Sequence, residues 1–195
     1  RKEYLDLFAQ GLPAGLNMLT TALGIFSITY FVSYFGKESV AAYGIAIRIE
    51  QIGLLPFIGL NVATLSIVGQ NYGARLIKRV GDTRKQVMKY GLIQTSITAV
   101  IFFIFAERLV GLFTEDVIVI QIGAGYLRVA VFITAAYLIL STNIATLQGI
   151  KRPVFGLIIG LYRQLIAPIT VYTVLTRVFS FGVQSIWLGI LCINW

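Results

Sequence analysis

Histidine is absent from the sequence, and cysteine occurs once, at Cys192. A disulfide bond within the chain is therefore impossible, and metal sites built from clustered Cys and His side chains are excluded. Charged residues are also scarce, since they make up 12% of the 195 residues, whereas soluble domains usually carry about a quarter. The lone cysteine has apolar neighbours and is expected to serve as a packing residue.

The few charged residues occur in short clusters, and long uncharged runs separate these clusters. Hydrophobic residues make up 57% of the chain, and the mean hydropathy is +0.85. A helix needs about 20 apolar residues to cross about 30 Å of hydrocarbon. The runs lack the alternating polarity of barrel strands, and helices bond their own backbone groups within lipid. The sequence therefore predicts an all-α integral membrane protein.

Six transmembrane helices are predicted to form one bundle. The first has Pro13 in its first turn, where proline is tolerated, and Pro56 is expected to bend the second. The sequence opens on Arg1 rather than methionine, and the last run is still apolar at Trp195. We therefore expect the chain to be part of a longer protein, with an incomplete last span. The predicted spans cover residues 12–35, 40–72, 90–106, 117–147, 154–175 and 179–195.

The basic residues lie unevenly on the two sides of this bundle. Of the 16 Lys and Arg residues, ten fall on the side of the N-terminus, three on the other side and three within the segments. Because basic loops stay in the cytoplasm, both ends of the chain are predicted to be cytoplasmic in a multi-pass protein of the cell membrane. The stretch from Arg75 to Lys89 is expected to form an amphipathic surface helix on anionic head groups. Membrane lipids, rather than nucleic acid, are therefore the partners that the net charge of +8 indicates.

Charged residues at membrane depth are costly and mark functional sites by default. Arg163 lies near the middle of a 24-residue interval between flanking basic residues, so any 20-residue span there contains it. We expect it to face protein or a wet cavity. Arg48 and Glu50 lie either at the outer boundary of the second span or about 10–14 Å inside it, at about 1.5 Å per residue. Arg128 can lie at the outer interface by snorkelling.

Polar uncharged residues mark further candidate positions within the spans. Thr21 follows Asn17 by one helical turn, and Tyr137 and Ser141 are four residues apart with Gln148 seven beyond. Such groups either hold helices together or line a pathway. Pro168 also lacks a backbone donor for the carbonyl of Gln164. The candidate cavity residues are Asn17, Thr20, Thr21, Arg48, Glu50, Asn61, Tyr137, Ser141 and Arg163.

Several motifs, in order along nearly the whole chain, resemble the second half of the multidrug and toxic compound extrusion (MATE) family. The most extensive is Ala42–Glu50, followed by Pro56, Gly59 and Val68–Ala74, which resembles the family's second-lobe signature. The remaining motifs resemble the starts or ends of helices seven, ten and eleven of that family. They are Gly11-Leu12-Pro13, Tyr126-Leu127-Arg128, Leu147-Gln148-Gly149 with Lys151-Arg152-Pro153, and Tyr162-Arg163 with Pro168.

The resemblance implies one six-helix lobe, helices seven to twelve, of a twelve-helix transporter of the MOP superfamily. Such a protein exports organic cations and drugs in exchange for inward Na⁺ or H⁺, and the absent N-terminal lobe is its expected partner. Some branches of the family carry carboxylates near the positions of Thr21 and Tyr137. Since a hydroxyl group does not exchange a proton near neutral pH, the coupling ion is expected to bind mainly in the absent lobe.

Other functions are ranked lower. A lipid-linked oligosaccharide flippase of the same superfamily is the second reading, but gripping a pyrophosphate calls for several intramembrane cations. A complete six-helix protein that works as a homodimer is an alternative of another class. An intramembrane enzyme is not expected, because the spans hold neither His nor Asp for a metal, Ser-His or aspartyl site. No cofactor is expected either.

Overall fold

The computed structural model describes residues 2–178 and 182–195, without the side chains of residues 2, 3, 5–7, 9, 10, 14, 17 and 176–178. The described residues are almost entirely helical, which confirms the predicted all-α fold. A single wide turn, the π-helix η1, interrupts one of the helical rods. In chain order the elements are α1 (Lys2–Ser33), α2 (Lys37–Gly73), α3 (Ile77–Gly111), α4 (Val117–Gly149), α5 (Pro153–Leu161), η1 (Tyr162–Ile166), α6 (Ala167–Val178) and α7 (Gln184–Asn194).

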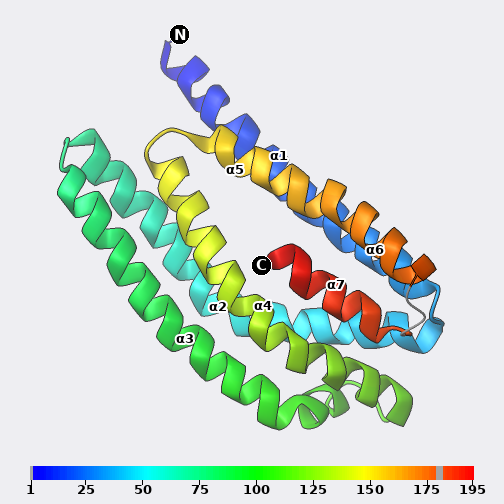
Figure 1. Cartoon of the computed structure of the whole chain (residues 1–195). Helices are drawn as coiled ribbons and strands as arrows, with labels where there is room; N and C mark the ends of the chain where they lie inside the picture. Colours follow the sequence, from blue (N-terminus) through cyan, green and yellow to red (C-terminus); the bar gives the residue numbers. More distant parts are fainter. Residues whose placement is uncertain (1, 179–181) are drawn as a thin grey trace.

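The helices form two groups that lie side by side (Figure 1). In the first group, α2, α3 and α4 contact one another extensively. In the second group, α1 lies along the continuous rod made by α5, η1 and α6. α7 contacts both α6 and α4 and so joins the two groups. Where α2, α4 and α7 meet, the buried rings of Tyr43, Tyr126 and Trp187 pack together, with centroids 4.9–5.7 Å apart.

Five helical segments among the described residues are long and apolar enough to cross a membrane: Gly11–Ser33, Lys37–Gly73, Ile77–Gly111, Val117–Gly149 and Pro153–Leu175. α7 has 11 residues and extends about 16 Å at about 1.5 Å per residue, which is about half of the hydrocarbon thickness. The predicted sixth span begins at Phe179, which lies outside the described residues.

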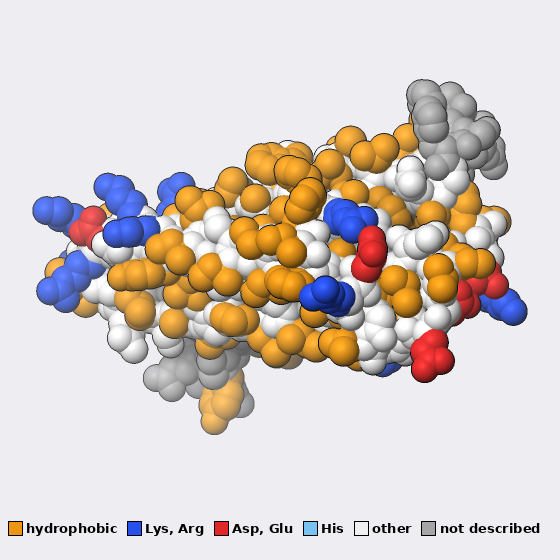
Figure 2. All heavy atoms as spheres, turned by 90° about the horizontal axis from the view of Figure 1, so that it is seen from below, with side chains coloured by type: hydrophobic (Ala, Val, Ile, Leu, Met, Phe, Trp, Pro, Cys, Tyr) orange, Lys and Arg blue, Asp and Glu red, His pale blue; other side chains and the backbone are white. Residues whose placement is uncertain are grey.

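The outer surface is largely apolar. Large side chains such as Phe26, Ile52 and Ile104 are exposed on three different helices. Figure 2 shows hydrophobic side chains over most of one face and Lys and Arg side chains gathered at one end. In water such a surface would be unfavourable, since monomeric soluble proteins rarely expose large apolar patches. It is the surface that a bilayer accepts.

Two helices begin ten or more residues before the predicted spans. α1 starts at Lys2, so Pro13 lies inside the helix rather than in its first turn. The basic stretch that begins at Arg75 is not a separate surface helix, because α3 starts at Ile77 and continues through the next span. Both differences have one cause: hydropathy locates the part of a helix that lipid accepts, whereas the helix itself extends into polar sequence.

Basic residues in left-handed backbone conformations end α2 and α4. Arg75 has φ 60° and Lys151 has φ 61°. After each of them the chain donates a 2.8 Å backbone hydrogen bond to the helix it has left, from Leu76 to Asn71 and from Arg152 to Leu147. These bonds satisfy carbonyls that a helix end leaves open. Each connector is therefore a closed turn of three residues.

The middle of α2 carries a bend, which Figure 1 shows as a change of direction about halfway along the helix. Pro56, expected to bend it, has no N–H to donate to the carbonyl four residues earlier. That carbonyl belongs to Ile52. The carbonyl of the next residue, Gly53, accepts a 2.9 Å hydrogen bond from Gln94 Nε2 on α3. The same Nε2 is 2.9 Å from Thr98 Oγ1. α3 therefore supplies polar groups to the backbone of α2 at the point where its helical ladder is incomplete.

The Gln94→Ala substitution is expected to destabilise the protein by about 1–2 kcal/mol, because it removes the shorter of two side-chain hydrogen bonds to the half-buried Gly53 carbonyl. Thermal unfolding in detergent, followed by intrinsic fluorescence, measures the change. Gln86→Ala on the exposed side of the same helix is the control and should alter stability by less than about 0.5 kcal/mol. Equal unfolding midpoints for the two variants would contradict the assigned role of Gln94.

Candidate functional site

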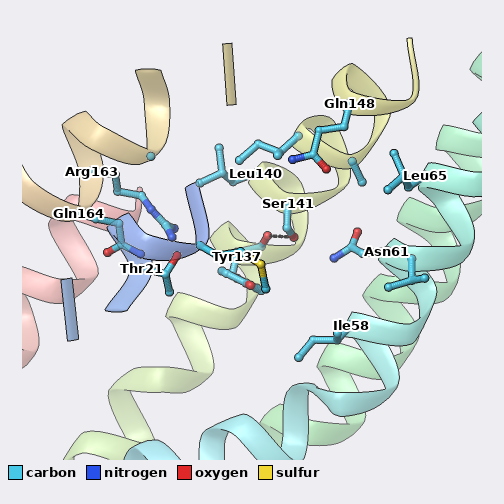
Figure 3. A pocket seen from close by; sticks show the side chains of 15 residues that line it. Thr21, Ile58, Asn61, Leu65, Tyr137, Leu140, Ser141, Gln148, Arg163 and Gln164 are labelled. Atoms are coloured by element: carbon cyan, nitrogen blue, oxygen red, sulfur yellow. Dashed lines mark hydrogen bonds between the residues drawn. The ribbon is translucent and has the colours of Figure 1, made fainter. Parts of the chain in front are cut away.

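A cavity of about 370 Å³ lies between the two groups of helices (Figure 3). α1, α2, α4, α5 and η1 all contribute to its wall, so residues far apart in the sequence meet there. The wall combines a few polar side chains with a larger apolar area. It consists of Met18, Thr21, Ile58, Asn61, Val62, Leu65, Tyr137, Leu140, Ser141, Ile144, Ala145, Gln148, Gly160, Arg163 and Gln164.

α4 supplies a polar face to this cavity. Tyr137, Ser141 and Gln148 all line it, as their spacing of four and seven residues predicts for one side of a helix. The Ser141 hydroxyl donates a hydrogen bond to the Tyr137 carbonyl of its own helix. That bond leaves its oxygen lone pairs available to accept from a ligand. Gln148 extends the polar face toward the end of α4.

Arg163 lies on η1, where the helix winds more widely than an α-helix. The N–H of Ala167 donates to the Tyr162 carbonyl five residues earlier, which is the π-type bond. Arg163 lines this cavity, and it also lines a second cavity of about 480 Å³ toward α7. Its Nη1 donates to Asn194 Oδ1 at 2.9 Å, and its guanidinium carbon lies 5.8 Å from the centroid of the Tyr137 ring.

Two candidates reach the cavity from other helices. Thr21 comes from α1 and Asn61 from α2. The Oδ1 atom of Asn61 is buried and has no hydrogen-bond partner among the described residues, although buried amide oxygens are nearly always satisfied. A ligand or a water molecule that donates to it would complete the site. The sequence alone cannot show that this oxygen lacks a partner.

Three other sequence candidates are not in the wall of this cavity, and a fourth lies outside the described side chains. Thr20 is buried in the packing of α1, and the side chain of Asn17 lies outside the described residues. Arg48 is exposed on α2 and is not part of the cavity wall. Glu50 is not part of it either, since its Oε2 accepts a 2.6 Å hydrogen bond from the Tyr126 hydroxyl within the aromatic cluster.

Glu50 and Asn61 have different surroundings on α2. An unbent helix would place Glu50 and Asn61, eleven residues apart, on one face. In the structure Glu50 faces α4 through Tyr126, whereas Asn61 lines the cavity. The bend at Pro56 lies between them. Arg128, expected at the outer interface, is exposed and forms an ion pair of 2.9 Å with Glu107.

Gln164 is a site residue that the sequence candidates did not include. Its side chain packs against Gly24 of α1 so closely that a Cβ atom on Gly24 would lie 2.5 Å from Gln164 Oε1. Only a glycine on α1 allows this approach. Two features of the sequence could have indicated Gln164 as a site residue. It lies beside Arg163, and its carbonyl lacks the usual N–H donor because Pro168 follows four residues later. Neither feature reveals which helix lies opposite.

The sequence profile of the MatE family matches residues 13–173 of the chain. The chain is 23% identical over 186 residues to the probable multidrug resistance protein NorM of Thermotoga maritima, aligning 95% of its own length with 40% of that protein. It is 29% identical over 182 residues to the probable multidrug resistance protein YpnP of Bacillus subtilis, again with 92% and 40% covered. The chain therefore spans about two fifths of the length of these relatives.

A solved structure shares this fold. It is described as the outward-facing conformation of a multidrug resistance MATE family transporter of the MOP superfamily. The whole of this chain superposes on 44% of that one with a TM-score of 0.92, at 23% sequence identity. The fold is thus that of one lobe of such a transporter.

Proposed function

The chain belongs to the MatE family, and we propose that it supplies one six-helix lobe, the C-terminal one, of a secondary active efflux transporter in the cell membrane. The complete transporter would export small organic molecules in exchange for inward Na⁺ or H⁺. Curated relatives are named as multidrug resistance proteins. Both ends of the lobe are proposed to face the cytoplasm, because most of the basic residues lie on that side.

The cavity between the two helix groups carries this proposal. Its volume of about 370 Å³ falls within the range of about 300–1,000 Å³ that small-molecule sites occupy. The apolar wall suits an organic body, and the polar groups of Asn61, Tyr137 and Gln148 can fix its orientation. Transporter substrates typically bind near the middle of the membrane between structural repeats. A cavity lined from five elements can change shape as those elements move.

The proposed division of labour between the lobes follows from what this cavity contains. Among its described wall residues, Arg163 is the charged one and no carboxylate is present. We propose that the coupling ion, and any cationic group of a substrate, bind to acidic residues of the other lobe. A pyrophosphate is usually held by several cations. Because the described wall holds one arginine, a flippase is the less favoured of the two functions.

Efflux of a cationic dye from cells that express the full-length protein tests the proposal. Collapsing the Na⁺ and pH gradients in turn identifies the coupling ion, and collapse of the coupled gradient should stop efflux. The Asn61→Leu substitution removes a hydrogen-bonding group from the cavity wall and is expected to lower the efflux rate at least about fivefold, the effect of about 1 kcal/mol of lost binding.

The control for this experiment is Asn71→Leu on the same helix. The Asn71 side chain donates to the Ile67 carbonyl and lies outside the cavity wall, so efflux should stay near the wild-type rate at equal expression. Efflux that continues with both gradients collapsed would refute secondary active transport. Equal efflux by the two variants would refute the role of the cavity.

A further inference from the structure

Arg163 carries a charge that no described carboxylate neutralises. The ion pairs between described residues join Lys37 to Glu38 and Arg128 to Glu107. The two contacts of the Arg163 guanidinium are instead with neutral groups, the Asn194 side-chain oxygen and the Tyr137 ring. A guanidinium has five N–H donors, and the bond to Asn194 uses one of them. An unpaired charge among apolar helices is costly, and an anion beside it would offset that cost.

The wall around Arg163 suits the rest of an amphiphilic molecule. Figure 3 shows the guanidinium reaching from η1 toward Tyr137, with Asn61 across the cavity. Between them the wall is mixed: the polar groups of Tyr137 and Ser141 on α4 lie among apolar side chains, which are those of Met18, Ile58, Val62, Leu65, Leu140 and Ile144. Across the cavity, the buried Oδ1 atom of Asn61 has no hydrogen-bond partner among the described residues. The cavity thus has a cationic group on one side, a neutral polar group on the other, and a mainly apolar wall with a few hydroxyl groups between them.

Local packing holds the guanidinium in place. On η1 the neighbouring Gln164 is pressed against Gly24 of α1, which fixes the rotation of the π-helix relative to α1. Asn194 on α7 holds the guanidinium itself from the other side, and its own Nδ2 donates to the Ile190 carbonyl at 2.7 Å. That second bond orients the amide so that its oxygen faces Arg163. A positive group that is held in place in this way does not need to be ordered when a ligand binds.

We propose that this cavity binds an amphiphilic organic ligand through its anionic group, a carboxylate, sulfonate or phosphate, placed at Arg163. The proposal rests on the proposed transport function and names the substrate group that this lobe receives. The apolar body of the ligand lies along α2 and α4, and a donor on its far end reaches Asn61. A substrate that also carries a cationic group is bound there by the other lobe.

A matched pair of probes tests the sign of the preferred charge. The full-length protein, in nanodiscs of phosphatidylcholine, is titrated by equilibrium dialysis with 2-naphthalenesulfonate and with 2-naphthyltrimethylammonium. The two probes share one ring system and carry opposite charges. The sulfonate is expected to bind at least about tenfold more tightly, the ratio that about 1.4 kcal/mol produces. Equal affinities, or tighter binding of the ammonium probe, would overturn the proposal.

Three variants assign the preference to Arg163. Arg163→Gln should abolish the preference for the sulfonate, whereas Arg163→Lys keeps the charge and should keep most of it. Arg128→Gln removes the same charge from an exposed ion pair on α4 and should leave both affinities unchanged. A preference that persists in Arg163→Gln would refute the assignment. If Arg163→Gln does not fold, Arg163→Lys and the wild-type protein still give the sign of the preferred charge.

A further arm separates the two sources of anionic amphiphiles. Nanodiscs that contain phosphatidylglycerol present an anionic lipid head group at high local concentration. If the cavity takes a membrane lipid, these nanodiscs will weaken sulfonate binding in the wild-type protein and not in Arg163→Gln. If it takes a soluble compound, binding will be unchanged, and both results support an anion site. The dialysis measures no transport, so loss of dye efflux with an intact sulfonate preference refutes only the proposed function.

Discussion

The Gly149→Val substitution is expected to lower the free energy of unfolding by about 3 kcal/mol, or to leave no folded protein, because overpacking of this kind forces a shift of the backbone. A Cβ atom at position 149 would lie 2.6 Å from Val68 Cγ1 and 3.2 Å from the Leu65 carbonyl oxygen on α2. A carbonyl oxygen cannot turn aside as a side chain can. α4 would therefore have to move away from α2, and small residues are what let membrane helices approach so closely.

Gly125→Val on the same helix is the matched control, because nothing lies within 4 Å of a Cβ atom there. It places the same side chain on α4 without a clash, and because valine is a better helix former than glycine, it should change stability by less than about 1 kcal/mol and should not destabilise the protein. The yield of monodisperse protein in detergent and the midpoint of thermal unfolding report both variants. Similar midpoints for Gly149→Val and Gly125→Val would show that the α2–α4 contact does not limit stability.

The second large effect is expected from Tyr126→Phe, which removes the hydroxyl that donates to Glu50 Oε2 at 2.6 Å. The carboxyl group then loses a partner that joins α2 to α4 across the buried aromatic cluster. Leaving a buried polar group with an unmade hydrogen bond costs about 1–3 kcal/mol. The packing of the ring is retained in the variant, so the loss reports the hydrogen bond. Thermal unfolding in detergent measures it.

Tyr34→Phe is the control for that experiment, since it also removes a tyrosine hydroxyl, one that donates to the exposed Tyr30 hydroxyl at 2.7 Å. Water replaces such a bond, and the change should stay within about 0.5 kcal/mol. A double-mutant cycle of Tyr126→Phe with Glu50→Gln isolates the coupling between the two side chains. A coupling near zero would mean that the two residues stabilise the fold independently.

Much of the fold follows from hydropathy and from the order of the motifs. Uncharged runs locate the helices that cross the membrane, because lipid excludes charge over a fixed thickness. The spacing of Tyr137, Ser141 and Gln148 places them on one side of α4, and the isolation of Arg163 among apolar residues indicates a side chain that faces protein or a wet cavity rather than lipid. Each of these inferences depends on a periodicity or a length within one helix.

Relations between helices were harder to predict. The close approach of Gln164 to Gly24, and of Gly149 to Val68, depends on which helices meet, and one sequence does not encode that in any local pattern. The π-helix at Tyr162–Ile166 lies just before Pro168, which leaves one helix carbonyl without its usual N–H donor. The sequence alone is equally compatible with a simple kink at this proline. Whether Glu50 and Asn61 share a face of α2 depends on the size of the bend at Pro56, which composition does not give.

The turns that end the helices have a consequence for motion. The links from α1 to α2, from α2 to α3 and from α4 to α5 are three residues long, and the link from α3 to α4 is five. Such short links keep the ends of consecutive helices close together. For helices joined in this way, a change of shape is expected to come mainly from within the rods, where the prolines and the wide turn interrupt the regular helical hydrogen bonds.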